Sequence, residues 1–289
     1  SEMFLPTLSR IDRRGDKVLT SRGIQGGTYM ESQIRYLAIV SERPEVLAGF
    51  YSRYFSMREL GRSDTGDVAL TDGFYNISIV KPRDGEPRGI SHFGVTIDDI
   101  GAVEARLRQF APATKIKKEE GGLFHGDYLV TDPSGQTVAL SSHQFHTPAV
   151  ERAFPCIRHM ATCVSNNDEV LDFYVNVFGF RESTTSKRIR AQNRVVRWAA
   201  DGATAMAILP DRSRRDMNER ESPKDGLNHF GWLVNDIHHF LESLPAGCLS
   251  ERPSSRPMAE YRGFDPDRNP FDISQDKGYE IDVDRWVHG

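Results

Sequence analysis

The chain contains the peptide Ile34-Arg35-Tyr36-Leu37-Ala38 and, 123 positions later, the related peptide Ile157-Arg158-His159-Met160-Ala161. Each peptide is followed closely by a Glu-Val-Leu sequence of the kind that starts a helix, at Glu45–Leu47 and at Glu169–Leu171. Because the same short strand-like and helix-like segments return in the same order, we interpret the chain as a duplicated structural unit.

The duplication extends over most of the chain. Further matched segments, each given as first and second copy, are Ser91–Gly94 with Asn228–Gly231, Asp98–Ile100 with Asn235–Ile237, Tyr128 with Tyr261, and Asp132–Gly135 with Asp265–Arg268. The offsets between copies drift from 123 to 137 positions. Such a drift indicates insertions in the loops between matched elements, where length changes are tolerated.

Each copy itself has two halves, since His92-Phe93-Gly94 resembles Tyr36-Leu37-Ala38. Four units therefore begin near residues 33, 90, 156 and 227. Apolar residues recur at helical spacing after the first strand of each copy, which predicts a helix with one buried face. The Asp72-Gly73 and Asp201-Gly202 turns lie between apolar runs, a pattern typical of β-hairpins.

Each unit is thus predicted to be βαβββ, and the fold class to be α+β with two tandem modules. The predicted domain organisation is an N-terminal extension (1–32), a first module (33–142), a linker (143–155) and a second module (156–289).

These units, a His in the first strand, a second His in a His-Phe-Gly strand and a closing Asp-Pro turn resemble the vicinal oxygen chelate superfamily. That superfamily includes glyoxalase I, bleomycin-resistance proteins and type I extradiol dioxygenases. The resemblance implies that each pair of units forms an incomplete β-barrel whose inner face carries metal ligands from the first strand of each unit and from the last strand. In the second module these positions are His159, His229 and Asp272.

The corresponding positions of the first module are Tyr36, His92 and Ala139, so we expect a metal only in the second module. Two imidazoles and one carboxylate leave coordination positions open and suit Fe(II), with Mn(II) or another first-row divalent ion as alternatives. If the closing strand were instead the later segment Tyr279–Asp282, then Glu280 or Asp282 would supply the carboxylate.

A metal site in the second of two modules is the arrangement of the type I extradiol dioxygenases. The resemblance therefore implies an Fe(II)-dependent ring-cleaving dioxygenase of aromatic catabolism, acting with O₂ on a catechol-like substrate. The family's catalytic His would fall near Thr204, where none stands. Its catalytic Tyr would fall near Tyr261 and Arg262, so Tyr261 fits after a shift of one residue. The alternatives are a glyoxalase-type lyase, isomerase or epimerase and a non-enzymatic resistance-type binding protein.

The substrate pocket is expected on the strands of the second module. Its candidate residues are Trp198, Thr204, Met206, Ile208, Trp232 and Arg262. The apolar side chains among them suit an aromatic or hydrophobic ligand.

Composition narrows the remaining possibilities. The net charge is −4 and the basic residues are dispersed, which argues against a nucleic-acid partner. The three cysteines show no CxxC spacing, which favours a reducing compartment over a disulfide framework. No apolar run predicts a membrane span or signal peptide, so we expect a cytoplasmic protein. Its expected partner is a small-molecule substrate, and assembly into a homo-oligomer stays open.

Overall fold

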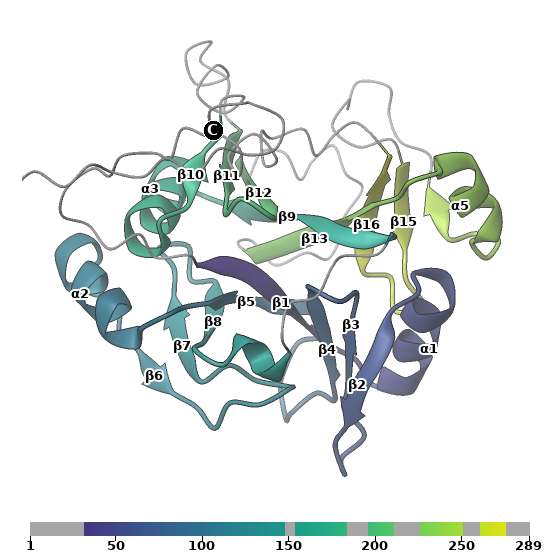
Figure 1. Cartoon of the computed structure of the whole chain (residues 1–289), viewed down its shortest axis with the longest axis horizontal. Coiled ribbons are helices and arrows are strands. Elements are labelled where there is room, and N and C mark those ends of the chain that lie inside the picture. The colour runs from purple at the N-terminus through teal and green to yellow at the C-terminus, as the bar shows by residue number, and fades with distance from the viewer. Residues whose placement is uncertain (1–31, 148–153, 184–195, 211–225, 251–260, 276–289) are drawn as a thin grey trace, which may run out of the picture.

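A computed structural model describes residues 32–147, 154–183, 196–210, 226–250 and 261–275 (Figure 1). These residues form two eight-stranded mixed open sheets with helices packed against them. The strand orders are β2-β3-β4-β1-β5-β8-β7-β6 and β10-β11-β12-β9-β13-β16-β15-β14, so the second sheet repeats the first. The predicted α+β fold with two tandem modules is confirmed.

The first sheet is built from two βαβββ units. Its elements are β1 (Gln33–Val40), α1 (Pro44–Tyr54), β2 (Arg58–Arg62), β3 (Val68–Thr71), β4 (Asn76–Val80), β5 (Gly89–Thr96), α2 (Ile100–Phe110), β6 (Lys117–Lys118), β7 (Tyr128–Thr131) and β8 (Thr137–Ser141). Strands β1 and β5 pair antiparallel at the centre of the sheet. On the outer sides, β4 pairs parallel with β1, and β8 pairs parallel with β5. A 3-10 turn, η1 (Gln144–His146), follows β8.

The second sheet repeats this order. Its elements are β9 (Cys156–Val164), α3 (Asn167–Phe178), β10 (Arg181–Glu182), β11 (Arg197–Ala200), β12 (Ala205–Pro210), β13 (Gly226–Leu233), α5 (Ile237–Ser243), β14 (Leu249–Ser250), β15 (Tyr261–Phe264) and β16 (Pro270–Ser274). Both predicted Asp-Gly hairpins are present, as β3–β4 and β11–β12. No helix among the described residues has both the length and the apolarity that crossing a bilayer requires.

Repeated polar residues begin the helices that follow the central strands. The side chain of Asp99 accepts a hydrogen bond from the backbone amide of Gly101 at the start of α2. Asp236 accepts one from His239 at the start of α5, and Asn166 accepts one from Glu169 at the start of α3. Each cap satisfies a backbone donor that has no partner within the helix. The matched Asp98–Ile100 and Asn235–Ile237 segments therefore return because both begin a helix.

The first helix of each module lies between the two modules. Helix α1 packs beside its own β2–β4 half-sheet and also contacts β13, β16 and α5 of the second module, whereas α3 contacts α2 and β5 of the first (Figure 1). One continuous buried cluster consequently includes residues of both modules.

Two reciprocal hydrogen bonds join the central strands across the junction. The Asp72 carboxylate accepts from the backbone amide of Ile157 at 2.9 Å, and the Asp201 carboxylate accepts from the amide of Ile34. These residues are the aspartates of the two Asp-Gly turns and the first residues of the duplicated pentapeptides. The two modules are therefore related by an approximate twofold arrangement.

Candidate functional site

Three adjacent strands bring together the three predicted metal ligands. Gly231 of β13 pairs with His159 of β9 on one side and with Asp272 of β16 on the other. His229 lies two residues before Gly231, so its side chain projects from the same face of the sheet. Gly231 lies between His159 and Asp272 and has no side chain, so no side chain at that position separates the His159 imidazole from the Asp272 carboxylate.

Two pairs of donor atoms in this triad lie close together, although no group of three ligand-type side chains among the described residues is already arranged around a metal position. His159 Nε2 is 3.4 Å from His229 Nε2, which is 3.3 Å from Asp272 Oδ2. Donor atoms bound to a first-row divalent ion at about 2.1 Å and at angles somewhat above 90° lie about 3 Å apart, so the spacing fits such an ion. The three side chains are 3 %, 6 % and 2 % exposed. The donor set is the two-histidine, one-carboxylate combination that binds Fe(II) and Mn(II).

Asn228 fixes the orientation of one histidine. Its Oδ1 lies 2.6 Å from His229 Nδ1, and an amide oxygen can only accept, so Nδ1 carries the proton. The Nε2 lone pair of His229 is then directed toward the triad, as a metal ligand requires. A polar residue also precedes the histidine in the first copy, where Ser91 Oγ lies 3.1 Å from His92 Nδ1. That shared pattern is the sequence signal that could have identified Asn228.

Arg262 contacts the carboxylate of the triad. Its Nε donates to Asp272 Oδ1 at 2.8 Å, and the two residues pair across β15 and β16. Tyr261, proposed as a catalytic residue, pairs instead with Ile273 and packs against the core on the opposite face. The structure therefore does not bring Tyr261 to the triad, and the register of β15 places Arg262 there.

The face that carries His159 is lined by small apolar residues and one tryptophan. Trp198 lies with its ring centre 5.6 Å from that of His159. It packs in a buried cluster with four alanines, namely Ala161, Ala200, Ala205 and Ala207. Of the predicted pocket residues, Trp198 and Arg262 lie beside the triad.

The remaining pocket predictions are corrected by the structure. Met206 and Ile208 alternate with the alanines of β12, so they face the helix-covered core. Trp232 packs in the same core, 4.3 Å from Phe55 between ring centres. Thr204 lies in the β11–β12 turn, where its hydroxyl lies at hydrogen-bond distance, 3.5 Å, from the Ile34 carbonyl across the module junction. Glu280 and Asp282, the alternative carboxylates, lie outside the described residues.

The equivalent face of the first module is filled by aromatic side chains. Tyr36 stacks on Phe145 with ring centres 4.6 Å apart and donates to the Phe124 carbonyl. Phe145 comes from η1, within the stretch predicted as a linker, and packs with Tyr36 and Ala139 in a fully buried cluster. A Cβ at Gly94 would lie 2.4 Å from Phe145, so only glycine fits there. The sequence contains no local signal for this insertion of Phe145.

His92 is the remaining ligand-type residue of the first module. Burial, together with the nearby His125, lowers the pKa of His92 to about 4. The folded chain thus favours the neutral imidazole, whose stabilising effect is complete above pH 6.5 and declines as the pH falls toward 4.

Replacing His92 by Gln is expected to flatten the acid side of the stability profile. Between pH 7 and pH 5 the metal-free wild type should lose about 1 to 2 kcal/mol more unfolding free energy than His92→Gln. Urea unfolding at several pH values measures this difference. His238→Gln, which alters an exposed histidine of α5, is the matched control and should follow the wild type. Parallel wild-type and His92→Gln profiles would contradict the lowered pKa.

Comparisons with known proteins agree with this fold. The model of the glyoxalase/bleomycin resistance protein/dioxygenase superfamily matches residues 157–273. No match is found among curated protein sequences.

Solved structures with a similar fold include two dioxygenases and a glyoxalase. The Mn(II)-bound glyoxalase from Novosphingobium aromaticivorans has a TM-score of 0.62 and 15 % identity, covering 85 % of this chain and 82 % of that one. BphC, a halotolerant catechol dioxygenase, has a TM-score of 0.58 and 15 % identity, covering 85 % and 87 %. Homoprotocatechuate 2,3-dioxygenase from Brevibacterium fuscum, in complex with 3,4-dihydroxyphenylacetate, has a TM-score of 0.61 and 13 % identity, covering 85 % and 80 %. At these identities the similarity is one of fold.

Proposed function

We propose that this chain is a divalent-metal-dependent enzyme that cleaves catechol-like rings with O₂, because residues 157–273 match the model of the glyoxalase/bleomycin resistance protein/dioxygenase superfamily. The observation that carries the proposal is the convergence of His159, His229 and Asp272 within 3.4 Å contacts on one buried face. When bound, Fe(II) or Mn(II) would supply open coordination positions that bind and polarise two adjacent substrate oxygens.

The chain's own residues would bind and orient the substrate around that ion. Trp198 and the alanines packed with it make the surroundings of His159 apolar and exclude water, which suits an aromatic ring. Arg262 holds Asp272 Oδ1, which leaves Oδ2 directed toward His229. An aromatic vicinal diol is therefore the substrate class that these contacts favour.

One observation favours the glyoxalase-type lyase or isomerase as a second candidate. The register of β15 places Arg262 beside the triad and turns Tyr261 away from it, so the tyrosine proposed as the catalytic group of ring cleavage does not reach the site. The guanidinium of Arg262, close to the triad, would stabilise the enolate-like charge that forms when a separate base removes a proton from the substrate. The Mn(II)-bound glyoxalase among the similar structures supports this alternative.

Oxygen consumption distinguishes the two candidates. Protein purified anaerobically and loaded with Fe(II) is expected to consume O₂ with at least one member of a catechol panel that includes 3,4-dihydroxyphenylacetate, in a one-to-one ratio with ring-opened product. His159→Ala should abolish both metal binding and uptake. The matched control is His239→Ala, which removes an exposed histidine of α5 and should behave as wild type. Metal-loaded protein that consumes no O₂ with any catechol would rule out the dioxygenase and leave the lyase or isomerase.

A further inference from the structure

The outer face of the candidate metal site is covered by a helix of the other module. In β13 and β16, His229 and Asp272 alternate with Phe230 and Phe271, which face the opposite side of the sheet. The rings of α1 pack against these two residues, with Tyr51 at 6.1 Å from Phe230 and Phe50 at 6.2 Å from Phe271 between centres. Two of the three candidate ligands therefore have immediate neighbours that the first module holds.

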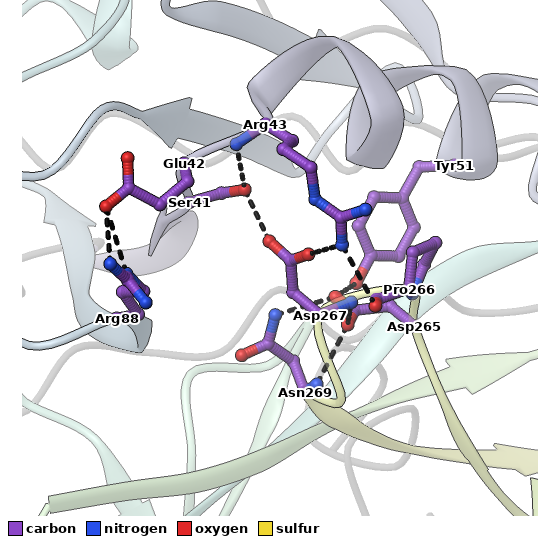
Figure 2. Close-up of polar contacts among 9 residues, drawn as sticks. All are labelled: Ser41, Glu42, Arg43, Tyr51, Arg88, Asp265, Pro266, Asp267 and Asn269. Carbon is purple, nitrogen blue, oxygen red and sulfur yellow. Dashed lines mark hydrogen bonds and ion pairs between the residues drawn. The ribbon is translucent and has the colours of Figure 1, made fainter.

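The turn that leads into β16 is also held by the first module (Figure 2). Tyr51 donates from its hydroxyl to Asp265 Oδ2 at 2.8 Å. At the edge of the same turn, Arg43 pairs with Asp267 Oδ1 at 2.6 Å, and Ser41 donates to Asp267 Oδ2. Asp272 lies in β16, the strand that follows this turn. The position of its carboxylate therefore depends on the position of the turn.

Asp265 is the residue that organises this turn. Its Oδ1 accepts from the backbone amides of Asp267 and Asn269 at 2.9 and 2.8 Å, and its Oδ2 accepts from Asn269 Nδ2 at 2.7 Å as well as from Tyr51. The carboxylate is 3 % exposed and the tyrosine is fully buried. Loss of the tyrosine hydroxyl would leave the buried carboxylate with three of these four donors and would remove the hydrogen bond by which α1 holds the turn.

The turn before the last strand of the first module is held by an equivalent contact, in which the helix comes from the second module. Tyr174 of α3 donates to Asp132 Oδ2 at 2.8 Å, and both residues are as buried as their counterparts. Asp132 begins the turn before β8, whose position equivalent to Asp272 is Ala139. The two contacts are thus chemically matched, but only the one made by Tyr51 leads to a candidate metal ligand.

We propose that Tyr51 is a positioning residue for the metal site, so that the first module, itself filled by Phe145, sets the geometry of Asp272 in the second. The proposal rests on the metal site of the proposed function, although not on which reaction it catalyses. It assigns the first module a role in metal binding through its helix α1.

Mn²⁺ binding by the full chain tests this assignment. Tyr51→Phe is expected to weaken Mn²⁺ binding about fivefold by calorimetry, which is less than the effect of losing a direct hydrogen-bond partner of a metal ligand. The paramagnetic resonance spectrum at saturating Mn²⁺ should also change, because the carboxylate donor is displaced. Tyr174→Phe should lower the unfolding midpoint by a similar amount, yet leave both the affinity and the spectrum as in wild type.

A second pair of variants keeps the test informative if Tyr51→Phe folds poorly. Arg43→Ala loosens the same turn through an exposed ion pair and should weaken Mn²⁺ binding about two- to fourfold. Arg88→Ala removes the neighbouring exposed pair with Glu42, shown in Figure 2, which does not touch the turn, and should have no effect. Equal Mn²⁺ affinity and spectra in Tyr51→Phe, Tyr174→Phe and wild type would overturn the proposal alone. Absence of Mn²⁺ binding by wild type would overturn it together with the proposed function.

Discussion

Asp272→Asn is expected to weaken Mn²⁺ or Fe²⁺ binding at least about 100-fold, because Asp272 is the one anionic donor of the triad. The same change is expected to destabilise the metal-free chain by about 3 to 5 kcal/mol, because it leaves the buried Arg262 guanidinium without the carboxylate 2.8 Å away. Calorimetric metal titration and urea unfolding measure the two effects separately.

A double variant separates the two consequences. Arg262→Gln combined with Asp272→Asn replaces the buried ion pair by neutral amides, so much of the lost stability should return. Metal affinity should not return, since the anionic donor is still missing. Wild-type affinity in the single variant would show that another carboxylate closes the triad, with Glu280 and Asp282 as the remaining candidates.

Phe55→Ala is expected to destabilise the whole chain by about 3 to 5 kcal/mol, although Phe55 belongs to the first module. Its fully buried ring lies 4.3 Å from that of Trp232 and 5.2 Å from that of Phe271 between centres. Truncation therefore opens a cavity in a core to which both modules contribute. The effect is measured by urea unfolding followed by tryptophan fluorescence and by circular dichroism.

The shape of the unfolding transition, in addition to the change in unfolding free energy, tests whether the two modules share one core. Because the buried cluster is continuous, both probes should report one transition at the same midpoint. Val46→Ala, a truncation at an exposed position of α1, is the control and should change stability by less than about 0.5 kcal/mol. Two separate transitions in wild type would contradict the prediction of a single cooperative core.

The sequence predicts the scaffold of this chain well, because the duplication reports the same constraint twice. The Asp-Gly turns, the helix starts and the central strands all recur with the same residue types. A chance resemblance at one of these places would not be repeated at the others. The triad is predicted because His159 and Asp272 replace Tyr36 and Ala139 of the first copy, while His229 matches His92. Such differences identify residues that are not needed for folding.

It is harder to predict from the sequence which side chains of a strand face the candidate metal site and which face the core. Residues 205–208 are all buried, so β12 shows no alternation of polar and apolar residues from which to infer its inner face. From the sequence alone, Met206 and Ile208 are therefore as good candidates for lining the pocket as the alanines with which they alternate. In β15 the two candidates for one position, Tyr261 and Arg262, are adjacent, and a shift of one residue reverses the face.

The contacts between modules could not be predicted from local patterns at all. Tyr51 and Asp265 are separated by 214 positions, and a tyrosine at helical spacing is equally consistent with a purely apolar environment. The insertion of Phe145 into the first module has the same origin, since it depends on how the chain turns after β8.

The placement of α1 and α3 across the junction has a consequence for a shortened chain. A polypeptide limited to the second module would lack α1, leaving Phe230, Trp232 and Phe271 uncovered, while its own α3 would lose its contacts with α2 and β5 of the first module. Since α3 is the counterpart of α1, two such polypeptides could cover each other's exposed strands. We expect the isolated half to form a symmetric homodimer.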